Sequence, residues 1–464
     1  MFDKKIYIKR REQLKKKIKT GLILFPGNDE APMNYADNTY KYRQDSTFLY
    51  YFGLDRAGLF AIIDADENKE IIFGDDFTVN DIVWMGKQPT IKQLAANVGV
   101  ANISSLSQLE SFIKKAISQG RKIHYVPQYR YDNMLKLENL LGINANAVNN
   151  YASIELIKAV ADQRSIKSNE ELKEIEKAIE ISYVMQTTAM QLARNGMVER
   201  EIAGFIEGIA LSMGNGLSFP TIFSKHGETL HNHSYNNILK NGDIVVNDSG
   251  VESFNHYSSD ITRTFPVSGK FTQKQKEIYQ IVLDAQLAAI KTAKPKITWR
   301  SVHLKSALVI AEGLKALGLM KGDMRTAVNE GAHALFYPHG LGHLLGLDVH
   351  DMENFGEQYT GYSTKILRSE QFGLKSLRYG KELMPGVVLT VEPGIYFIPE
   401  LIHQWEAEKK FVKYINYNKV KNYIGFGGIR IEDDIVITSK GCRVLGVPIP
   451  KSIDGVEAMS SEKI

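Results

Sequence analysis

The chain has 464 residues, with 57 lysines and arginines against 53 aspartates and glutamates, and 44% of its residues are hydrophobic. At roughly 150 residues per domain this length suggests two or three domains, and the hydrophobic share excludes wholesale disorder and a coiled-coil rod. The near balance of charge argues against a nucleic-acid partner. The single cysteine, Cys442, excludes a disulfide scaffold and a multi-cysteine zinc site.

The sequence predicts neither a membrane span nor an export signal. None of its apolar runs approaches the ~18 residues that a spanning helix needs. The basic segment Met1–Thr20 lacks the apolar core of a secretory signal. We therefore expect no membrane partner and a cytoplasmic location, with a periplasmic location as the alternative.

The first third of the chain alternates between short apolar runs and helical periodicity. Strands are predicted at Gly21–Gly27, Ser46–Leu54, Gly58–Asp66 and Asn68–Asp76, and helices around residues 90–120 and 130–142. This alternation predicts an α/β domain over residues 1–160. A linker is expected at Lys158–Asn169.

A second domain is predicted over residues 161–464. Ser168 is followed three residues later by Glu171, a capping box that marks the start of a long helix. Further helices are predicted around residues 198–213 and 273–293. From residue 217 onward, strands carry most of the residues that suggest chemistry.

Four carboxylates lie within or at the ends of apolar strands, namely Asp248, Asp260, Glu392 and Glu432. Burying a carboxylate costs several kcal/mol unless it is paired or bound to a metal ion. A single one could be a structural partner of Arg263 or Arg430. Four such carboxylates in one domain favour a metal site.

The spacing of the first two carboxylates sharpens this interpretation. Asp248 and Asp260 flank a turn-like segment, so a hairpin is predicted to place them directly opposite each other, with Cβ atoms about 4.5–5.5 Å apart. At that separation they repel unless a cation lies between them. Oxygen ligands suit Mg²⁺, Mn²⁺ or iron, and an added histidine favours a transition metal.

The histidine is expected from His339-Gly-Leu-Gly-His343, which His350 follows. The two glycines in the first segment argue against a zinc-binding helix. In an extended chain His339 and His343 would lie roughly 13 Å apart, so that they could not bind the same ion. One would then be a ligand and the other a substrate contact, although a hydrogen-bonded core histidine remains the alternative for His339.

A second histidine group precedes Asp248 and consists of His226, His231 and His233. By itself it is typical of a polar surface loop. Beside a metal site it could supply a proton donor or stabilise an oxyanion.

Taken in order, these motifs resemble those of the pita-bread metallopeptidases, and most closely aminopeptidase P and prolidase. The matching residues are Asp248, Asp260 in SDITRTF, His343 in HGLGH, Glu392 in TVEPG and Glu432 in GIRIEDD. Tyr42–Leu54 also resembles the start of aminopeptidase P chains. The resemblance implies a creatinase/prolidase-like N-terminal α/β domain and a C-terminal pita-bread catalytic domain.

The resemblance also implies a site for two divalent metal ions, usually Mn²⁺, with Co²⁺ or Zn²⁺ as alternatives. Asp248 would bind one ion, while Asp260 and Glu432 would bridge both. His343 and Glu392 would complete the second. The implied catalytic residues are His231, His339, His350, the proton shuttle Glu392, and Arg430, which supports the ligands.

The implied activity is that of an Xaa-Pro aminopeptidase, in which a metal-bridging hydroxide attacks the carbonyl before a proline in second position. Prolidase, which cleaves only Xaa-Pro dipeptides, is the alternative. A creatinase-like enzyme without metal and an inactive binding scaffold are less expected. The implied partners are peptide substrates and further copies of the chain, as a dimer or larger oligomer.

The chain departs from the family pattern in two ways. Eleven residues separate the two aspartates where the family usually has ten, and Ser249 replaces the common alanine or glycine. The segments Met352–Lys381 and Pro399–Tyr423 are longer than the pattern. We expect them to flank the cleft and to affect substrate length preference or subunit contacts.

Overall fold

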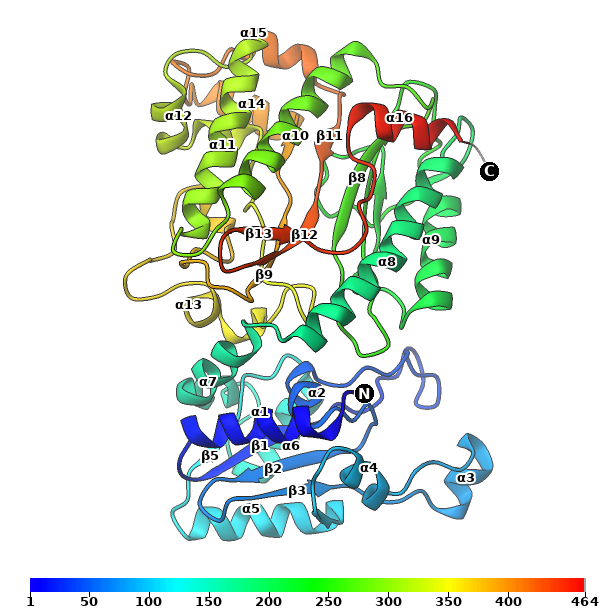
Figure 1. The fold of residues 1–464 in the computed structure, drawn as a ribbon, viewed down its shortest axis with the longest axis vertical. Helices are drawn as coiled ribbons and strands as arrows, with labels where there is room; N and C mark the ends of the chain where they lie inside the picture. The colour runs from blue at the N-terminus through cyan, green and yellow to red at the C-terminus, as the bar shows by residue number, and fades with distance from the viewer. Residues whose placement is uncertain (463–464) are drawn as a thin grey trace. The chain divides into compact units, whose positions relative to one another are not determined.

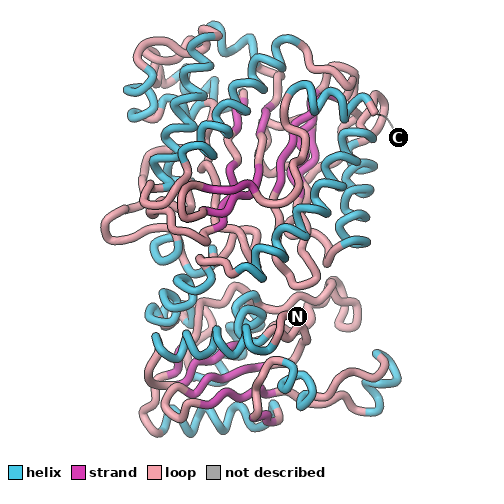
Figure 2. Tube along the Cα trace, viewed as in Figure 1, coloured by secondary structure: helices cyan, strands magenta, loops and turns pink. Residues whose placement is uncertain are grey.

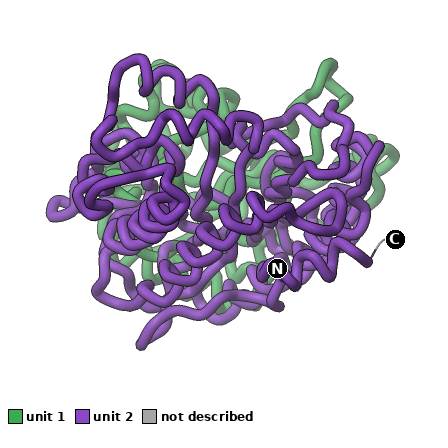
Figure 3. Tube along the Cα trace, turned by 90° about the horizontal axis from the view of Figure 1, so that it is seen from above, with its two compact units in different colours: residues 1–164, 352–360 green, residues 165–351, 361–464 purple. Residues whose placement is uncertain are grey.

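The computed structural model describes residues 1–462. The chain divides into two compact units, residues 1–164 with 352–360 and residues 165–351 with 361–464 (Figure 3). Both units mix helices and strands (Figures 1 and 2), which confirms the predicted α/β class. Within residues 1–462, no helix combines the length and apolar character needed to cross a membrane.

The first unit contains a five-stranded sheet with the order β4-β3-β2-β1-β5. Its strands are β1 (Leu22–Pro26), β2 (Phe60–Asp64), β3 (Lys69–Phe73), β4 (Asn102–Ser104) and β5 (Ile123–His124). Strands β1, β2 and β3 pair antiparallel, whereas β4 and β5 add in parallel at the two edges. Its helices are α1 (Lys4–Lys17), α2 (Ser46–Phe52), α3 (Val79–Met85), α4 (Ile91–Asn97), η1 (Leu106–Gln108), α5 (Leu109–Ser118), α6 (Tyr131–Leu141), η2 (Val148–Tyr151), α7 (Ile154–Arg164), η4 (Glu353–Phe355) and α13 (Glu357–Thr360).

One prediction for this unit is wrong, and a second is right only in part, because the boundary between the units at Arg164 and Ser165 lies inside the predicted linker. The strand predicted at Ser46–Leu54 is helix α2, because Asp45 accepts hydrogen bonds from the first backbone N–H groups and Gly53 ends the helix at φ 62°. These end signals outweigh the β propensity of the aromatic run. The linker predicted at Lys158–Asn169 is helical through Arg164, since α7 buries an apolar face there.

In the part of the second unit that the structure describes, the strands form three small sheets. They have the orders β6-β7-β8, β13-β12-β9 and β10-β11. The strands are β6 (Ile222–Ser224), β7 (Ile244–Ser249), β8 (Ile261–Pro266), β9 (Val388–Val391), β10 (Gly394–Tyr396), β11 (Gly428–Arg430), β12 (Asp433–Ile437) and β13 (Cys442–Val444).

The helices of this unit pack with its strands around the larger of two hydrophobic core clusters. They are α8 (Asn169–Leu192), α9 (Glu199–Met213), α10 (Gln273–Thr292), α11 (Trp299–Ala316), α12 (Met324–Glu330), η3 (Ala332–Leu335), η5 (Leu374–Ser376), α14 (Pro399–Ala407), α15 (Tyr417–Val420), η6 (Lys421–Tyr423) and α16 (Ile453–Ser461). The predicted capping box of Ser168 and Glu171 is confirmed at the start of α8. Helix α8 packs on β7 and β8, while α10 packs on β9, β10 and β11 (Figure 1).

The register of the β7–β8 hairpin differs from the prediction. Asp248 is opposite Thr262, and Ser249 is opposite Ile261, so Asp248 and Asp260 are not direct partners. The turn closes through a hydrogen bond from Ser253 to Tyr257, which centres it one residue later than expected. The two aspartates are therefore offset by two positions, and since side chains alternate along a strand, they still share a face.

The predicted strand around Glu432 is two strands in different sheets. Strand β11 pairs with β10, whereas β12 pairs with β9. Glu432 lies in the short crossing between them, and its backbone N–H donates to Thr262 O at 3.0 Å. The crossing therefore holds Glu432 beside the β7–β8 hairpin.

Candidate metal centre

The structure brings all nine predicted site residues to one cavity of about 650 Å³ in the second unit. They come from the ends of strands, the β11–β12 crossing and two loops. The residues are Asp248, Asp260, His343, Glu392, Glu432, His231, His339, His350 and Arg430.

Three of these residues form a compact group of ligand atoms. One atom from each of Asp260, His343 and Glu432 lies within 4.8 Å of the others. The Nε2 atom of His343 is 3.3 Å from Asp260 Oδ2 and 3.6 Å from Glu392 Oε1. The Nδ1 atom of His343 is 3.1 Å from the carbonyl oxygen of Leu344, a contact that orients Nε2 toward the carboxylates, as is common for metal-binding histidines.

His339 has a different environment from His343. Its two nitrogens are each 2.8 Å from an oxygen, Nδ1 from Gly340 O and Nε2 from Tyr396 Oη. Burial lowers the pKa of His339 to about 3. The chain from Leu341 to Leu345 runs antiparallel beside β9, with Glu392 N–H donating to Leu341 O and Thr390 N–H to His343 O. Both histidines nevertheless reach Glu392, with His339 Nδ1 at 3.7 Å from Oε2.

Arg430 lies behind Asp248 and links several polar side chains. It donates to Asp248 Oδ2, to Tyr396 Oη at 3.0 Å and to Thr262 Oγ1 at 3.1 Å. Thr262 in turn donates to Glu432 Oε2 at 2.7 Å. Each of these two carboxylates therefore has one oxygen held by the protein.

The second oxygens of the same carboxylates are buried without a protein partner. Within residues 1–462, neither Asp248 Oδ1 nor Glu432 Oε1 has a hydrogen-bond partner. Because an unpaired buried carboxylate oxygen is costly, such atoms need a ligand outside the chain. The donor set of oxygens with one imidazole nitrogen fits divalent transition metal ions.

The crowding of carboxylates raises their pKa values. Burial and then the charge of Asp248 hold the pKa of Asp260 well above its ordinary value, and burial and then Asp260 do the same for Glu432. Burial raises the pKa of Glu392 to about 7. Bound cations would remove this repulsion, which is a second reason why the site fits metal ions.

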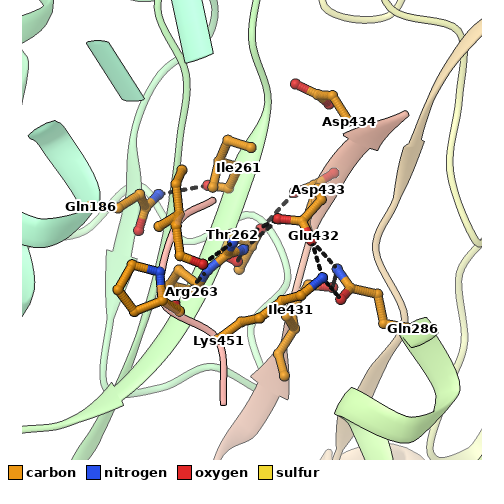
Figure 4. A network of polar contacts seen from close by, with 12 residues as sticks. Gln186, Ile261, Thr262, Arg263, Gln286, Ile431, Glu432, Asp433, Asp434 and Lys451 are labelled. Atoms are coloured by element: carbon orange, nitrogen blue, oxygen red, sulfur yellow. Dashed lines mark hydrogen bonds and ion pairs between the residues drawn. The ribbon is translucent and has the colours of Figure 1, made fainter. Parts of the chain in front are cut away.

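A buried polar network supports the crossing that carries Glu432 (Figure 4). Arg263 donates to Glu432 O and to Asp433 Oδ1, both at 2.6 Å. Burial pushes the pKa of Asp433 up, but the charges of Arg263 and Lys451 outweigh it and hold the pKa below its ordinary value. Arg263 is thus the partner of Asp433, a structural carboxylate that the sequence analysis did not single out.

The remaining histidines also line the cavity. The rings of His343 and His350 are 4.1 Å apart between centroids. His231 and His233 line the same cavity, whereas His226 lines a separate one. Burial and then the charge of Arg430 lower the pKa of His231.

Sequence reasoning missed several other residues that line the cavity. Ser376 and Arg378 come from the segment Met352–Lys381, whose extra length was the only signal for them. For the apolar residues that line the cavity, the sequence contained no recognisable motif. These residues are Phe219, Pro220, Ile222, Leu230, Pro338 and Val349.

The chain is similar to known proteins over most of its length. Residues 173–439 match metallopeptidase family M24, and residues 7–125 match the aminopeptidase P N-terminal domain. The chain is 32% identical to the Xaa-Pro aminopeptidase of Escherichia coli (strain K12), over 91% of this chain and 90% of that protein. It is 30% identical to the Xaa-Pro dipeptidase of Homo sapiens, over 94% of this chain and 88% of that protein.

Solved structures show the same similarity. Proline aminopeptidase P II from Yersinia pestis matches with a TM-score of 0.81 and 30% identity, covering 99% of this chain and 100% of that one. This match, together with the two matched domains, confirms the predicted N-terminal α/β domain and C-terminal pita-bread domain. The chain belongs to metallopeptidase family M24.

Proposed function

We propose that the protein is an Xaa-Pro aminopeptidase, which releases the N-terminal residue from peptides with proline in second position. The observation that carries the proposal is the group of carboxylates with unpaired buried oxygens beside His343 in one cavity. The similarity to the Xaa-Pro aminopeptidase of Escherichia coli supports the substrate class. In this proposal residues 1–160 form the aminopeptidase P-like domain and residues 161–464 the catalytic domain.

The residues proposed to hold two metal ions are Asp248, Asp260, His343, Glu392 and Glu432. When bound, two divalent ions lower the pKa of a water molecule and polarise the carbonyl group under attack. We propose Mn²⁺ as the native metal, with Co²⁺ or Zn²⁺ as alternatives. A zinc-substituted aminopeptidase P of Escherichia coli is among the similar solved structures.

The side chains around the ligands have separate proposed roles. Glu392 accepts a proton from the attacking water and passes it to the leaving amine. His231 and His350, which line the cavity, donate hydrogen bonds to the oxyanion that develops on the substrate. His339 and Arg430 orient these groups through their shared partner Tyr396.

The cavity also has a surface suited to proline. Phe219, Ile222, Leu230 and Val349 contribute an apolar wall to the same space as the carboxylates. A pyrrolidine ring has no N–H group in the peptide bond and presents mainly apolar surface, so it fits a wall that offers no hydrogen bonds. This wall supports selectivity for a residue that ordinary peptide-binding grooves do not favour.

A dipeptidase is the second candidate, and two observations favour it. The chain is 30% identical to the Xaa-Pro dipeptidase of Homo sapiens. Arg378 brings a cation to the cavity, where a substrate carboxylate could meet it at short distance if the substrate ended at proline.

Kinetics on matched peptides separate the two candidates. Measuring kcat/KM on Xaa-Pro and on Xaa-Pro-Xaa substrates should give efficient hydrolysis of the longer peptide. Activity on the dipeptide alone would overturn the aminopeptidase proposal. In that case Arg378→Met should raise KM for the dipeptide, whereas it should affect longer peptides less.

We also propose that the protein is a cytoplasmic homodimer or larger oligomer. Helix α3 in the first unit exposes a run of large apolar side chains, with Val79, Val83 and Trp84 each more than 70% exposed. Such a surface is unusual on a monomer and typical of a contact with another chain. A second copy of this chain is the proposed occupant.

A further inference from the structure

One buried ion pair in the second unit lies outside the set of predicted site residues. Lys167 directly precedes the cap of helix α8, and Asp351 directly follows His350. Lys167 Nζ is 2.8 Å from Asp351 Oδ2, and each side chain is 1% exposed. Because removing one partner would strand a buried charge, the pair strongly restrains the positions of both residues.

The pair closes a tight turn that carries His350. Backbone hydrogen bonds join Asp351 N–H to Leu344 O at 2.9 Å and Gly346 N–H to Asp348 O at 3.1 Å. The chain therefore doubles back after His343 and returns beside it. The bend that this return requires follows Gly346, and it brings the rings of His343 and His350 to 4.1 Å.

Gly346 shows that the turn is built around the ion pair. A Cβ atom at this position would lie 2.5 Å from Asp351 Oδ2 and 2.8 Å from Lys167 Cε. Both distances are shorter than real contacts, so any larger residue would displace the pair. Glycine is therefore required at position 346, because the side chains of the ion pair occupy the space where a Cβ atom would lie.

Lys167 is itself fixed to the sheet that carries a proposed ligand. Its backbone N–H donates to Gly386 O at 2.8 Å, just before strand β9, which leads to Glu392. Because the backbone of Lys167 is fixed in this way, its ammonium group is held in position to bind Asp351. Gly386, just before β9, thus holds Lys167, and Lys167 holds Asp351, which directly follows His350.

We propose that the ion pair of Lys167 and Asp351 is a positioning device that holds His350 against the cavity. The proposal rests on the proposed function, in which His350 donates to the developing oxyanion. Lys167 and Asp351 touch no substrate and act only through His350. The metal ligands are held by other contacts, so metal binding does not depend on the pair.

A double-mutant cycle on purified enzyme tests this coupling. Lys167→Met should lower kcat about ten- to a hundredfold, since small misplacement of a catalytic group has effects of this size, while metal content stays unchanged. In the His350→Ala background the same substitution should cause no further loss of kcat. Additive losses, or loss of metal from Lys167→Met, would overturn the proposal.

Two further variants separate positioning from general stability. Lys167→Met with Asp351→Asn removes both charges, so it should recover melting temperature but not kcat. Glu457→Gln is the matched control, because Glu457 is a buried carboxylate paired with Lys270 and Lys276 elsewhere in the unit. It should lower the melting temperature and leave kcat unchanged, and a loss of kcat like that of Lys167→Met would count against a specific role.

A crystal structure gives a readout that does not depend on the proposed activity. In Lys167→Met, the turn from Leu344 to Asp351 should shift or lose density, while the carboxylates of Asp260 and Glu432 stay in place. An unshifted His350 would refute the positioning role. If the wild type cleaves no Xaa-Pro peptide, the proposed function fails, but this structural test still decides whether the pair positions His350.

Discussion

The stability of the second unit should depend on pH through His333. This residue lies on η3, fully buried, and within residues 1–462 neither of its ring nitrogens has a hydrogen-bond partner. Burial lowers the pKa of His333 from 6.5 to about 4. Between these values the unfolded chain binds the proton and the folded one does not, so the stabilisation present above pH 6.5 is lost as the pH falls toward 4.

The size of the effect follows from the two pKa values. At 1.36 kcal/mol for each pH unit, the difference amounts to about 3 kcal/mol. Urea unfolding of the metal-free wild type and of His333→Phe should be measured from pH 7.5 to pH 4. Over this range the free energy of unfolding of the wild type should fall by this amount more than that of His333→Phe. Substitution of the exposed His403 by Gln serves as the control. The same pH dependence in wild type and His333→Phe would refute the reasoning.

Three further predictions concern the metal site and the assembly. Asp260→Ala or Glu432→Ala should abolish metal binding and activity while the circular dichroism spectrum stays native, because each is proposed to bridge both ions; retained turnover would contradict this. His350→Ala should lower kcat about 10²-fold or more with unchanged metal content, whereas His343→Ala should lose metal. If metal analysis instead shows loss of metal in His350→Ala and not in His343→Ala, the proposed roles of the two histidines are exchanged. Light scattering at micromolar concentration should show a dimer or larger, and Trp84→Glu should shift it toward the monomer; a monomeric wild type would refute the oligomer.

The four carboxylates could be singled out because each breaks a strong local rule, whereas the choice of His343 as a ligand came only from the resemblance. Asp248 and Glu392 are charged residues in apolar strands, and a buried charge without a partner is too costly to be accidental. The start of α8 was equally predictable, since the capping box is a local signal. Features that depend on neighbouring residues in the chain are thus visible in the sequence.

Features that depend on distant parts of the chain were not visible. A shift of one residue at the centre of the β7–β8 turn changed the partner of Asp248, and nothing local to the strands fixes that centre. The crossing at Glu432 exists because β11 and β12 pair with strands of two different sheets. Arg378 reaches the cavity from a long irregular segment that has no periodicity to read.

Arg430 allows a test of how the protein holds Asp248, one of the proposed metal ligands. Its three nitrogens donate to Asp248, Tyr396 and Thr262. The contact fixes Oδ2 of Asp248, a residue that lines the cavity, and leaves its Oδ1 without a protein partner. Arg430→Lys keeps the charge but offers one nitrogen in place of a planar fork, so it cannot maintain all three contacts.

We expect Arg430→Lys to weaken metal binding about 10- to 100-fold, the usual cost of losing a group that orients a ligand. Metal titration against a competing chelator measures this directly, without reference to any substrate. Arg443→Lys is the matched control, because Arg443 pairs with Glu176 at the surface, about half exposed, and does not line the cavity. Equal metal affinity in wild type and Arg430→Lys would show that charge alone holds Asp248, and that the fork geometry of the guanidinium has no part in shaping the site.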